Sequence, residues 1–113
     1  MLPQNKKLHL NKDFDKIFKT GRSLYGRFLG VKIIKNNLDV SRFGVILGLK
    51  ISKSSVIRHQ SKRLIFRIIS DLESKLPFFI DCVIIALPSI KEASTSELES
   101  EIKEIFSKIS NKL

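Results

Sequence analysis

One segment in the middle of the chain, residues 56–76, most constrains what this sequence can fold into. Ser54 or Ser55 can cap the start of a helix here, and Pro77 would stop it. At about 100° per residue, the apolar side chains fall into one stripe along this helix, namely Ile57, Leu64, Ile65, Ile68, Ile69, Leu72 and Leu76. Because such a stripe must be covered by other apolar elements, the rest of the chain has to supply them.

The remaining circumference of this predicted helix is strongly basic. It carries Arg58, His59, Lys62, Arg63 and Arg67, with no acid anywhere between the first and the last of them. Like charges this close repel one another unless an anion neutralises them. Three of the residues are arginines, whose planar guanidinium makes two-point contacts with phosphate oxygens. The pattern therefore predicts a phosphate-binding face, with His59 as a further donor.

Phe66 lies among these basic residues in the helical projection, and the sequence allows two interpretations of it. An exposed aromatic ring surrounded by cations is a stacking platform for an unpaired base. Alternatively, another part of the chain covers the ring, and Phe66 belongs to the core. Both interpretations stay open at this stage.

The charge of the whole chain agrees with a polyanionic partner. At 113 residues the chain has the length of a single domain, and its net charge is +10 with 42% hydrophobic residues. Residues 1–67 hold a net charge of +13, whereas residues 68–113 hold −3. The sequence thus predicts a folded basic module in which the first part of the chain faces the polyanion.

Several functional classes are not supported by any motif. No apolar run approaches the roughly 18–20 residues of a membrane span, and the start of the chain lacks a signal-peptide pattern, so we expect a cytoplasmic protein. Cys82 is the single cysteine, in an apolar run, and is expected to be a buried thiol. The two histidines and the absence of nucleophile or metal motifs predict no catalytic residue and no metal site in the protein.

The predicted elements indicate an α+β fold, a two-layer sandwich with helices on a small sheet. The expected order is helix, strand, strand, helix, strand, helix, over residues 10–21, 24–35, 43–49, 56–76, 81–87 and from 94 onward. The second strand is expected to pair with the first as a hairpin. The last helix opens on a Ser94 to Glu97 capping box, and its acids are assigned to a solvated side. Residues 1–8 are expected to be a flexible basic tail, and residues 9–113 a single domain.

The first predicted helix carries Phe14 and Phe18 four residues apart, hence on one face. Both can be core residues that pack the helix on the sheet. Alternatively, their edges form one wall of a groove, opposite a strand face that contains Phe28, Gly30 and Lys32. In that arrangement the glycine would let a nucleic-acid backbone come close, and Lys32 would neutralise it.

Taken together, these segments resemble the protein subunit of bacterial ribonuclease P over nearly the whole chain. Residues 10–21 resemble the opening helix of that family, and residues 42–44 with Lys50 resemble its strand ending in lysine. Residues 56–67 resemble its Arg-Asn-Arg-x-x-Lys-Arg helix, and residues 81–86 its last strand. The sequence departs from the family pattern at four positions, which are Lys32, His59, Gln60 and Phe66.

The resemblance implies the fold of ribosomal protein S5 domain 2, with a left-handed crossover, and a monomeric protein. It also implies that a large RNA subunit is the catalyst and uses bound Mg²⁺, while the protein binds that RNA and the 5′ leader of precursor tRNA. The residues implied to contact the RNA subunit are Lys50, Lys53, Arg58, His59, Lys62, Arg63, Phe66 and Arg67. Those implied to bind the leader are Phe14, Phe18, Phe28 and Lys32.

Two other functions compete with this one. The first is a structural RNA-binding protein of ribosomal type, with no part in cleavage; it would need the basic helix but no open surface around Phe14 and Phe18. The second is a module that binds anionic membranes through the basic amphipathic helix. The strand-rich context argues against the second, because the sheet needs the apolar stripe of that helix.

Overall fold

A single four-stranded sheet forms the centre of the molecule, in the order β1-β2-β4-β3. The strands are β1 (Arg22–Tyr25), β2 (Leu29–Lys35), β3 (Arg42–Ile46) and β4 (Ile80–Ala86). β2 pairs antiparallel with β1 and with β4, while β3 runs parallel to β4. β4 is the most apolar strand and lies inside the sheet, so both of its faces are largely buried.

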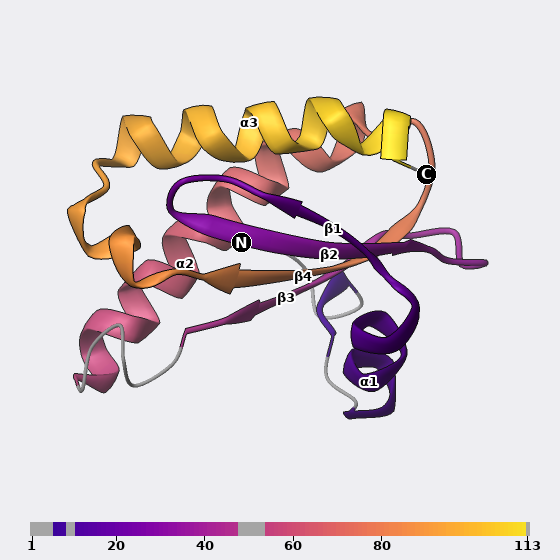
Figure 1. Cartoon of the computed structure of the whole chain (residues 1–113), viewed down its shortest axis with the longest axis horizontal. Helices are drawn as coiled ribbons and strands as arrows, with labels where there is room; N and C mark the ends of the chain where they lie inside the picture. Colours follow the sequence, from indigo (N-terminus) through magenta and orange to yellow (C-terminus); the bar gives the residue numbers. More distant parts are fainter. Residues whose placement is uncertain (1–5, 9–10, 48–53, 113) are drawn as a thin grey trace.

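Three α-helices surround the sheet in this computed structural model, which describes residues 6–8, 11–47 and 54–112. They are α1 (Asn11–Thr20), α2 (Ser55–Leu72) and α3 (Thr95–Lys112), with short 3₁₀ turns η2 (Glu73–Lys75) and η3 (Pro88–Glu92) on either side of β4. α2 and α3 lie on one side of the sheet and α1 on the other (Figure 1). The expected α+β fold is therefore confirmed, and α2 provides the crossover between the parallel strands β3 and β4.

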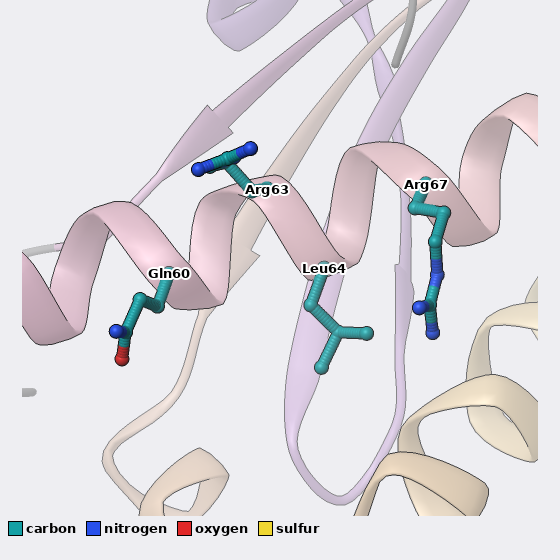
Figure 2. A pocket seen from close by; sticks show the side chains of 4 residues that line it. All are labelled: Gln60, Arg63, Leu64 and Arg67. Atoms are coloured by element: carbon teal, nitrogen blue, oxygen red, sulfur yellow. The ribbon is translucent and has the colours of Figure 1, made fainter.

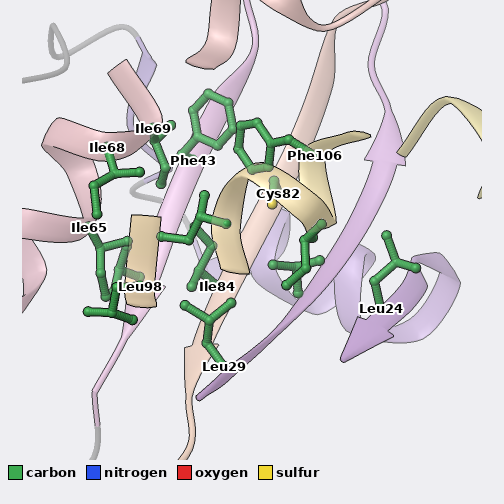
Figure 3. Packing of buried hydrophobic residues seen from close by; sticks show 14 of the residues in the cluster. Leu24, Leu29, Phe43, Ile65, Ile68, Ile69, Cys82, Ile84, Leu98 and Phe106 are labelled. Carbon is green, nitrogen blue, oxygen red and sulfur yellow. The ribbon is translucent and has the colours of Figure 1, made fainter. Parts of the chain in front are cut away.

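The main core fills the space between the sheet and the helices α2 and α3. Residues at alternate positions of the strands meet the apolar stripes of both helices there (Figure 3). The rings of Phe43 and Phe106 stack with their centroids 6.1 Å apart, which ties β3 to α3. A smaller cluster of Leu8, Ile17 and Val83 lies on the opposite face, under α1. Cys82 is fully buried in the main core, as expected, and this burial raises the pKa of its thiol.

Two helix caps follow the sequence prediction. The backbone N–H of Ile57 donates to the hydroxyl oxygen of Ser54, 3.3 Å away, so Ser54 caps α2. At α3 the capping box is complete, because Ser94 N–H donates to the Glu97 carboxylate and Glu97 N–H donates to the Ser94 hydroxyl.

The strand assignment was wrong in two respects. Residues 24–35 are not one strand: the chain turns at residues 26–28, so that β1 and β2 form the hairpin. The segment from Phe43 is not the partner of β2, since β4 lies between them. A long apolar run does not show where a turn interrupts it, and only the packing against α2 selects the parallel neighbour.

Residues 6–8 correct the predicted tail. Lys7 forms a parallel bridge with Phe43, Leu8 N–H donates to the Phe43 carbonyl at 2.9 Å, and Leu8 is buried. Lys6 pairs with Glu73 beyond the end of α2. The described part of this segment is therefore bound to the edge of the sheet, because its leucine completes the small cluster under α1.

Two further expectations fail at the helices. Ile57 was assigned to the buried stripe but is exposed, because the first turn of α2 projects beyond the end of β3 (Figure 1). Glu101 was assigned to the solvated side of α3, yet its carboxylate accepts from the backbone N–H groups of Arg27, Phe28 and Leu29. Glu101 thereby supplies acceptors for the amides of the β1–β2 turn and ties this turn to α3.

Candidate nucleic-acid interface

The predicted basic residues of α2 form one outward surface. His59, Lys62, Arg63 and Arg67 are exposed and Arg58 is half-buried; we call these five residues the α2 cationic face. The helix presents them outward because Ile65, Ile68 and Ile69 point into the main core. Arg67 lies 3.7 Å from the carboxylate of Glu99 on α3, and both side chains are more than half exposed. The pair is thus open to water and weak.

Phe66 does not belong to this surface. Only 5% of it is exposed, and it packs in the main core. The ammonium group of Lys7 lies 5.2 Å from the centroid of its ring, so the bound segment 6–8 covers Phe66 from outside. The stacking interpretation is therefore wrong, and the core interpretation is confirmed. Lys50 and Lys53, the other residues implied to contact the RNA subunit, lie outside the described residues.

A second surface lies on the face of the sheet that carries α1. Phe14 is half-buried and packs on the small cluster of Leu8, Ile17 and Val83. Its ring lies directly over Gly44, where an added Cβ would come within 2.8 Å of the ring. Phe18 is 39% exposed, and the Lys32 ammonium lies 3.4 Å from its carbonyl oxygen and 5.6 Å from its ring centroid.

Of the four residues implied to bind the leader, Phe28 is on the wrong side of the sheet. It is buried in the main core and precedes β2 within the β1–β2 turn. The alternation of a strand does not extend through this turn, so Phe28 does not share the face of Lys32. Phe18 and Lys32 are brought together at the surface, whereas Phe14, one turn earlier on α1, lies over Gly44.

Sequence analysis missed Tyr25, the most exposed aromatic side chain among the described residues at 71%. Its strand register pairs it with Gly30, and its ring covers that glycine so closely that a Cβ would lie 2.6 Å away. Ile85 and Ile46 continue the same row across the sheet. We call Phe18, Tyr25, Lys32 and Ile46 the α1-side surface. A turn signal at Gly26 could have ended the strand at Tyr25 and shown its exposure.

The two surfaces meet at a hollow beside the edge strand β3. It has a volume of about 400 Å³, and its lining comes from the end of β3 and the first turns of α2, namely Val45, Ile46, Leu47, Arg58, His59 and Lys62. Ile46 therefore belongs to the α1-side surface and also borders the α2 cationic face. A strand of nucleic acid could pass from one surface to the other along this hollow.

Arg42 shows that not every cation of the basic half is free for a ligand. Its guanidinium forms two hydrogen bonds to the Asp81 carboxylate, at 2.9 and 2.6 Å, and lies 3.5 Å from Asp13 of α1. The hydrogen bond to Asp81 raises the pKa of Arg42 further. Asn36 donates to the same carboxylate at 2.9 Å. This group of side chains joins α1, β3 and β4.

Two kinds of feature are absent from the described residues. Within residues 6–8, 11–47 and 54–112, no group of three or more His, Cys, Asp or Glu side chains could hold a metal ion. None of the helices in the same ranges is long and apolar enough to cross a membrane.

Comparison with known proteins now decides the family. A family model described as ribonuclease P matches residues 2–110, which is almost the entire chain. The chain belongs to the ribonuclease P protein family. Members of this family are the protein subunit of the ribonucleoprotein endonuclease that matures the 5′ end of tRNA, and they pair with an RNA subunit. The same role applies to this chain.

Individual ribonuclease P proteins agree with this over most of their lengths. The ribonuclease P protein component of Alkaliphilus metalliredigens is 33% identical over 108 residues, with 96% of both chains covered. That of Clostridioides difficile is 31% identical over 105 residues, with 90% of both covered.

Solved ribonuclease P proteins share the fold. A Staphylococcus aureus mutant protein with defective mRNA degradation activity superposes with a TM-score of 0.84 at 25% identity, over 97% of this chain and 92% of that one. The Thermotoga maritima protein gives 0.82 at 25% identity, over 90% and 96%.

Proposed function

We propose that the α2 cationic face binds the RNA subunit of ribonuclease P, together with Lys50 and Lys53. The observation that carries this proposal is the concentration of five basic side chains on the outward side of one rigid helix, Arg58, His59, Lys62, Arg63 and Arg67. Arginine forks on such a helix can make two-point contacts with successive phosphates. Each contact releases counterions from the RNA, so the resulting affinity depends on salt.

The second part of the proposal is that the α1-side surface binds the single-stranded 5′ leader of precursor tRNA. Phe18 and Tyr25 offer aromatic surface to unpaired bases, and Lys32 between them can neutralise a phosphate. Phe14 packs on the small cluster under α1 and so anchors the helix that carries Phe18. In this arrangement the RNA subunit and the leader meet at the hollow next to Ile46.

In this proposal the RNA subunit holds the catalytic Mg²⁺, and the protein contributes no catalytic residue. Its cations neutralise phosphates where substrate and RNA subunit meet, which reduces the free Mg²⁺ needed to screen their repulsion. The protein acts as a monomer in the cytoplasm, where precursor tRNA is made.

Reconstitution tests this function. The protein is combined with the RNA subunit from the same source, and cleavage of a precursor tRNA with a long leader is followed at low Mg²⁺. We expect strong stimulation over the RNA alone, and less stimulation for a precursor with a one-nucleotide leader. Protein that binds the RNA subunit without stimulating cleavage would support a structural RNA-binding protein instead.

A further inference from the structure

A second hollow lies along α2, apart from the one beside β3. It has a volume of about 360 Å³ and is lined by Gln60, Arg63, Leu64 and Arg67. These positions fall within about 100° of one another on a helix, but the Arg63 side chain points away from the other three (Figure 2). Gln60, Leu64 and Arg67 point the same way from the helix (Figure 2). The volume is within the range of about 300–1,000 Å³ of pockets that take small organic groups.

The lining of this hollow combines two kinds of chemistry. Arg63 and Arg67 bring two guanidinium groups, and none of the described residues that line the hollow carries a carboxylate, which favours a phosphate. Gln60 adds an amide that can both donate and accept, and Leu64 adds apolar surface. A phosphate alone could accept from the Gln60 amide but would make no use of Leu64. A nucleotide would use all four, because it joins a phosphate to a sugar and a base.

One carboxylate competes with a ligand for Arg67. Glu99 of α3 lies 3.7 Å from Arg67, and both side chains are more than half exposed. An exposed ion pair of this kind is weak enough for a phosphate to replace, since a two-point guanidinium–phosphate contact is stronger. When the phosphate takes Arg67, the Glu99 carboxylate loses its partner and is left close to a like charge.

We propose that this hollow binds one nucleotide of the RNA subunit, and that Glu99 lowers its affinity by competing for Arg67. Arg67 holds the phosphate and Arg63 adds positive charge at the rim, while Gln60 and Leu64 meet the sugar or the base. The proposal rests on the function proposed above, because it assumes that α2 faces RNA. It adds Gln60, Leu64 and Glu99 to the residues that determine how the RNA is bound.

Binding of the transcribed RNA subunit across a salt series tests the role of Glu99. Glu99→Gln frees Arg67 without changing the size of the side chain. We expect its affinity to rise by about twofold to fivefold and the slope of log affinity against log salt to steepen by about 1. The matched control is Glu104→Gln, on the same helix, where Glu104 pairs with Lys108 instead. An equal rise in the control would reveal a general charge effect and overturn the competition.

A double substitution tests whether the effect passes through Arg67. On an Arg67→Ala background, Glu99→Gln should raise the affinity less than it does in the unmodified protein, because the contested cation is gone and only the repulsion between Glu99 and the RNA remains. An equal gain on both backgrounds would overturn the proposal.

Gln60→Ala tests the neutral part of the site. Gln60 is exposed, so the fold should tolerate its loss, which thermal unfolding can check. We expect an affinity lower by about threefold to tenfold with an unchanged salt slope, since no charge is lost.

Arg58→Ala with Lys62→Ala distinguishes failure of the nucleotide site from failure of the proposed function. If that variant binds weakly while Gln60→Ala and Glu99→Gln bind like the unmodified protein, only the nucleotide site fails. If it binds normally, the proposed function fails as well.

Discussion

At the scale of single residues, arginine serves two different purposes in this protein. Arg42 is held by Asp81 and Asp13 and joins three elements, so its charge is neutralised within the fold. Arg63 projects into solvent from α2 and is available to a phosphate. What differs is the number of carboxylates within reach, and this number follows from packing and not from residue type.

The Arg42–Asp81 pair leads to a prediction about stability. Asp81→Asn should lower the free energy of unfolding by about 3 kcal/mol, because it leaves the guanidinium of a largely buried pair without its two-point partner. Urea unfolding followed by circular dichroism measures the change. The exposed Asp15→Asn on α1 is the control and should stay within about 0.5 kcal/mol. Similar losses in both variants would argue against a special role for Asp81.

A second prediction at this scale concerns the capping box of α3. Hydrogen bonds from the backbone N–H and the hydroxyl group of Ser94 stabilise the ionised Glu97 carboxylate and hold its pKa below the ordinary value of 4.5. A carboxyl group whose pKa is lower in the folded protein than in the unfolded chain stabilises the fold at pH values above the unfolded pKa. This stabilisation is lost as the pH falls through the folded pKa. NMR titration of the Glu97 carboxyl carbon should show that Ser94→Ala raises its pKa towards 4.5. The rise should be partial, because the Ser94 backbone N–H, the larger cause of the lowered pKa, is kept. Ser107→Ala should leave the pKa unchanged, and an unaffected Glu97 in Ser94→Ala would contradict a contribution from the hydroxyl.

At the scale of elements, α1 shows how one helix face can hold two roles. Phe14 and Phe18 share a face by their spacing, but Phe14 lies over Gly44 while Phe18 lies farther along, beside Lys32. The helix crosses only part of the sheet, since the row from Tyr25 to Ile46 on the same face keeps exposed side chains at both ends. α1 thus forms one boundary of the α1-side surface.

This division predicts different effects for the two phenylalanines. Phe18→Ala should reduce cleavage of precursors with long leaders by about tenfold, the loss of about 1–3 kcal/mol expected for one base stack, while the protein still binds the RNA subunit normally. Phe14→Ala should instead destabilise the protein by about 3 kcal/mol. Cleavage assays with long and short leaders, together with urea unfolding, distinguish the two. If Phe18→Ala impaired cleavage and RNA-subunit binding equally, Phe18 would be only a core residue.

At the scale of the whole molecule, the charge of the chain is concentrated on particular elements. α2 carries the cationic face, whereas α3 carries four of the eleven acids, and among the described contacts it pairs with that face only at Glu99. The two proposed RNA surfaces lie on opposite sides of the sheet and meet at the edge strand β3. A small domain can in this way contact two RNAs through one border.

The α2 cationic face gives the prediction at this scale. Arg58→Ala with Arg63→Ala should weaken binding of the RNA subunit by about 3 kcal/mol and reduce the salt slope by about two. Filter binding at several salt concentrations measures both quantities. Lys103→Ala with Lys108→Ala on α3 removes the same charge elsewhere and should have a much smaller effect. An unchanged slope in the α2 variant would contradict the assignment of this face.

The helices and their caps could be predicted from the sequence because their signals are local. The period of Ile65, Ile68 and Ile69, the cap at Ser54 and the capping box at Ser94 all lie within a few residues of each other. The basic side of α2 could be predicted for the same reason. Membership of the ribonuclease P protein family was also visible in these local motifs, and the comparisons confirm it.

Contacts between distant parts of the chain decided the features that the local signals do not predict. Phe66 looked open in the helical projection, but the segment around Lys7 covers it from a distant part of the chain. Phe28 is buried and Tyr25 is exposed because a turn at residues 26–28 resets the alternation of the strand. The Glu101 carboxylate accepts from the backbone amides of that turn. By itself the sequence determined which helices form and where their charge lies, since these depend on neighbours along the chain. Only the tertiary structure decided which aromatic rings face solvent, because that depends on strand register and on what packs against each face.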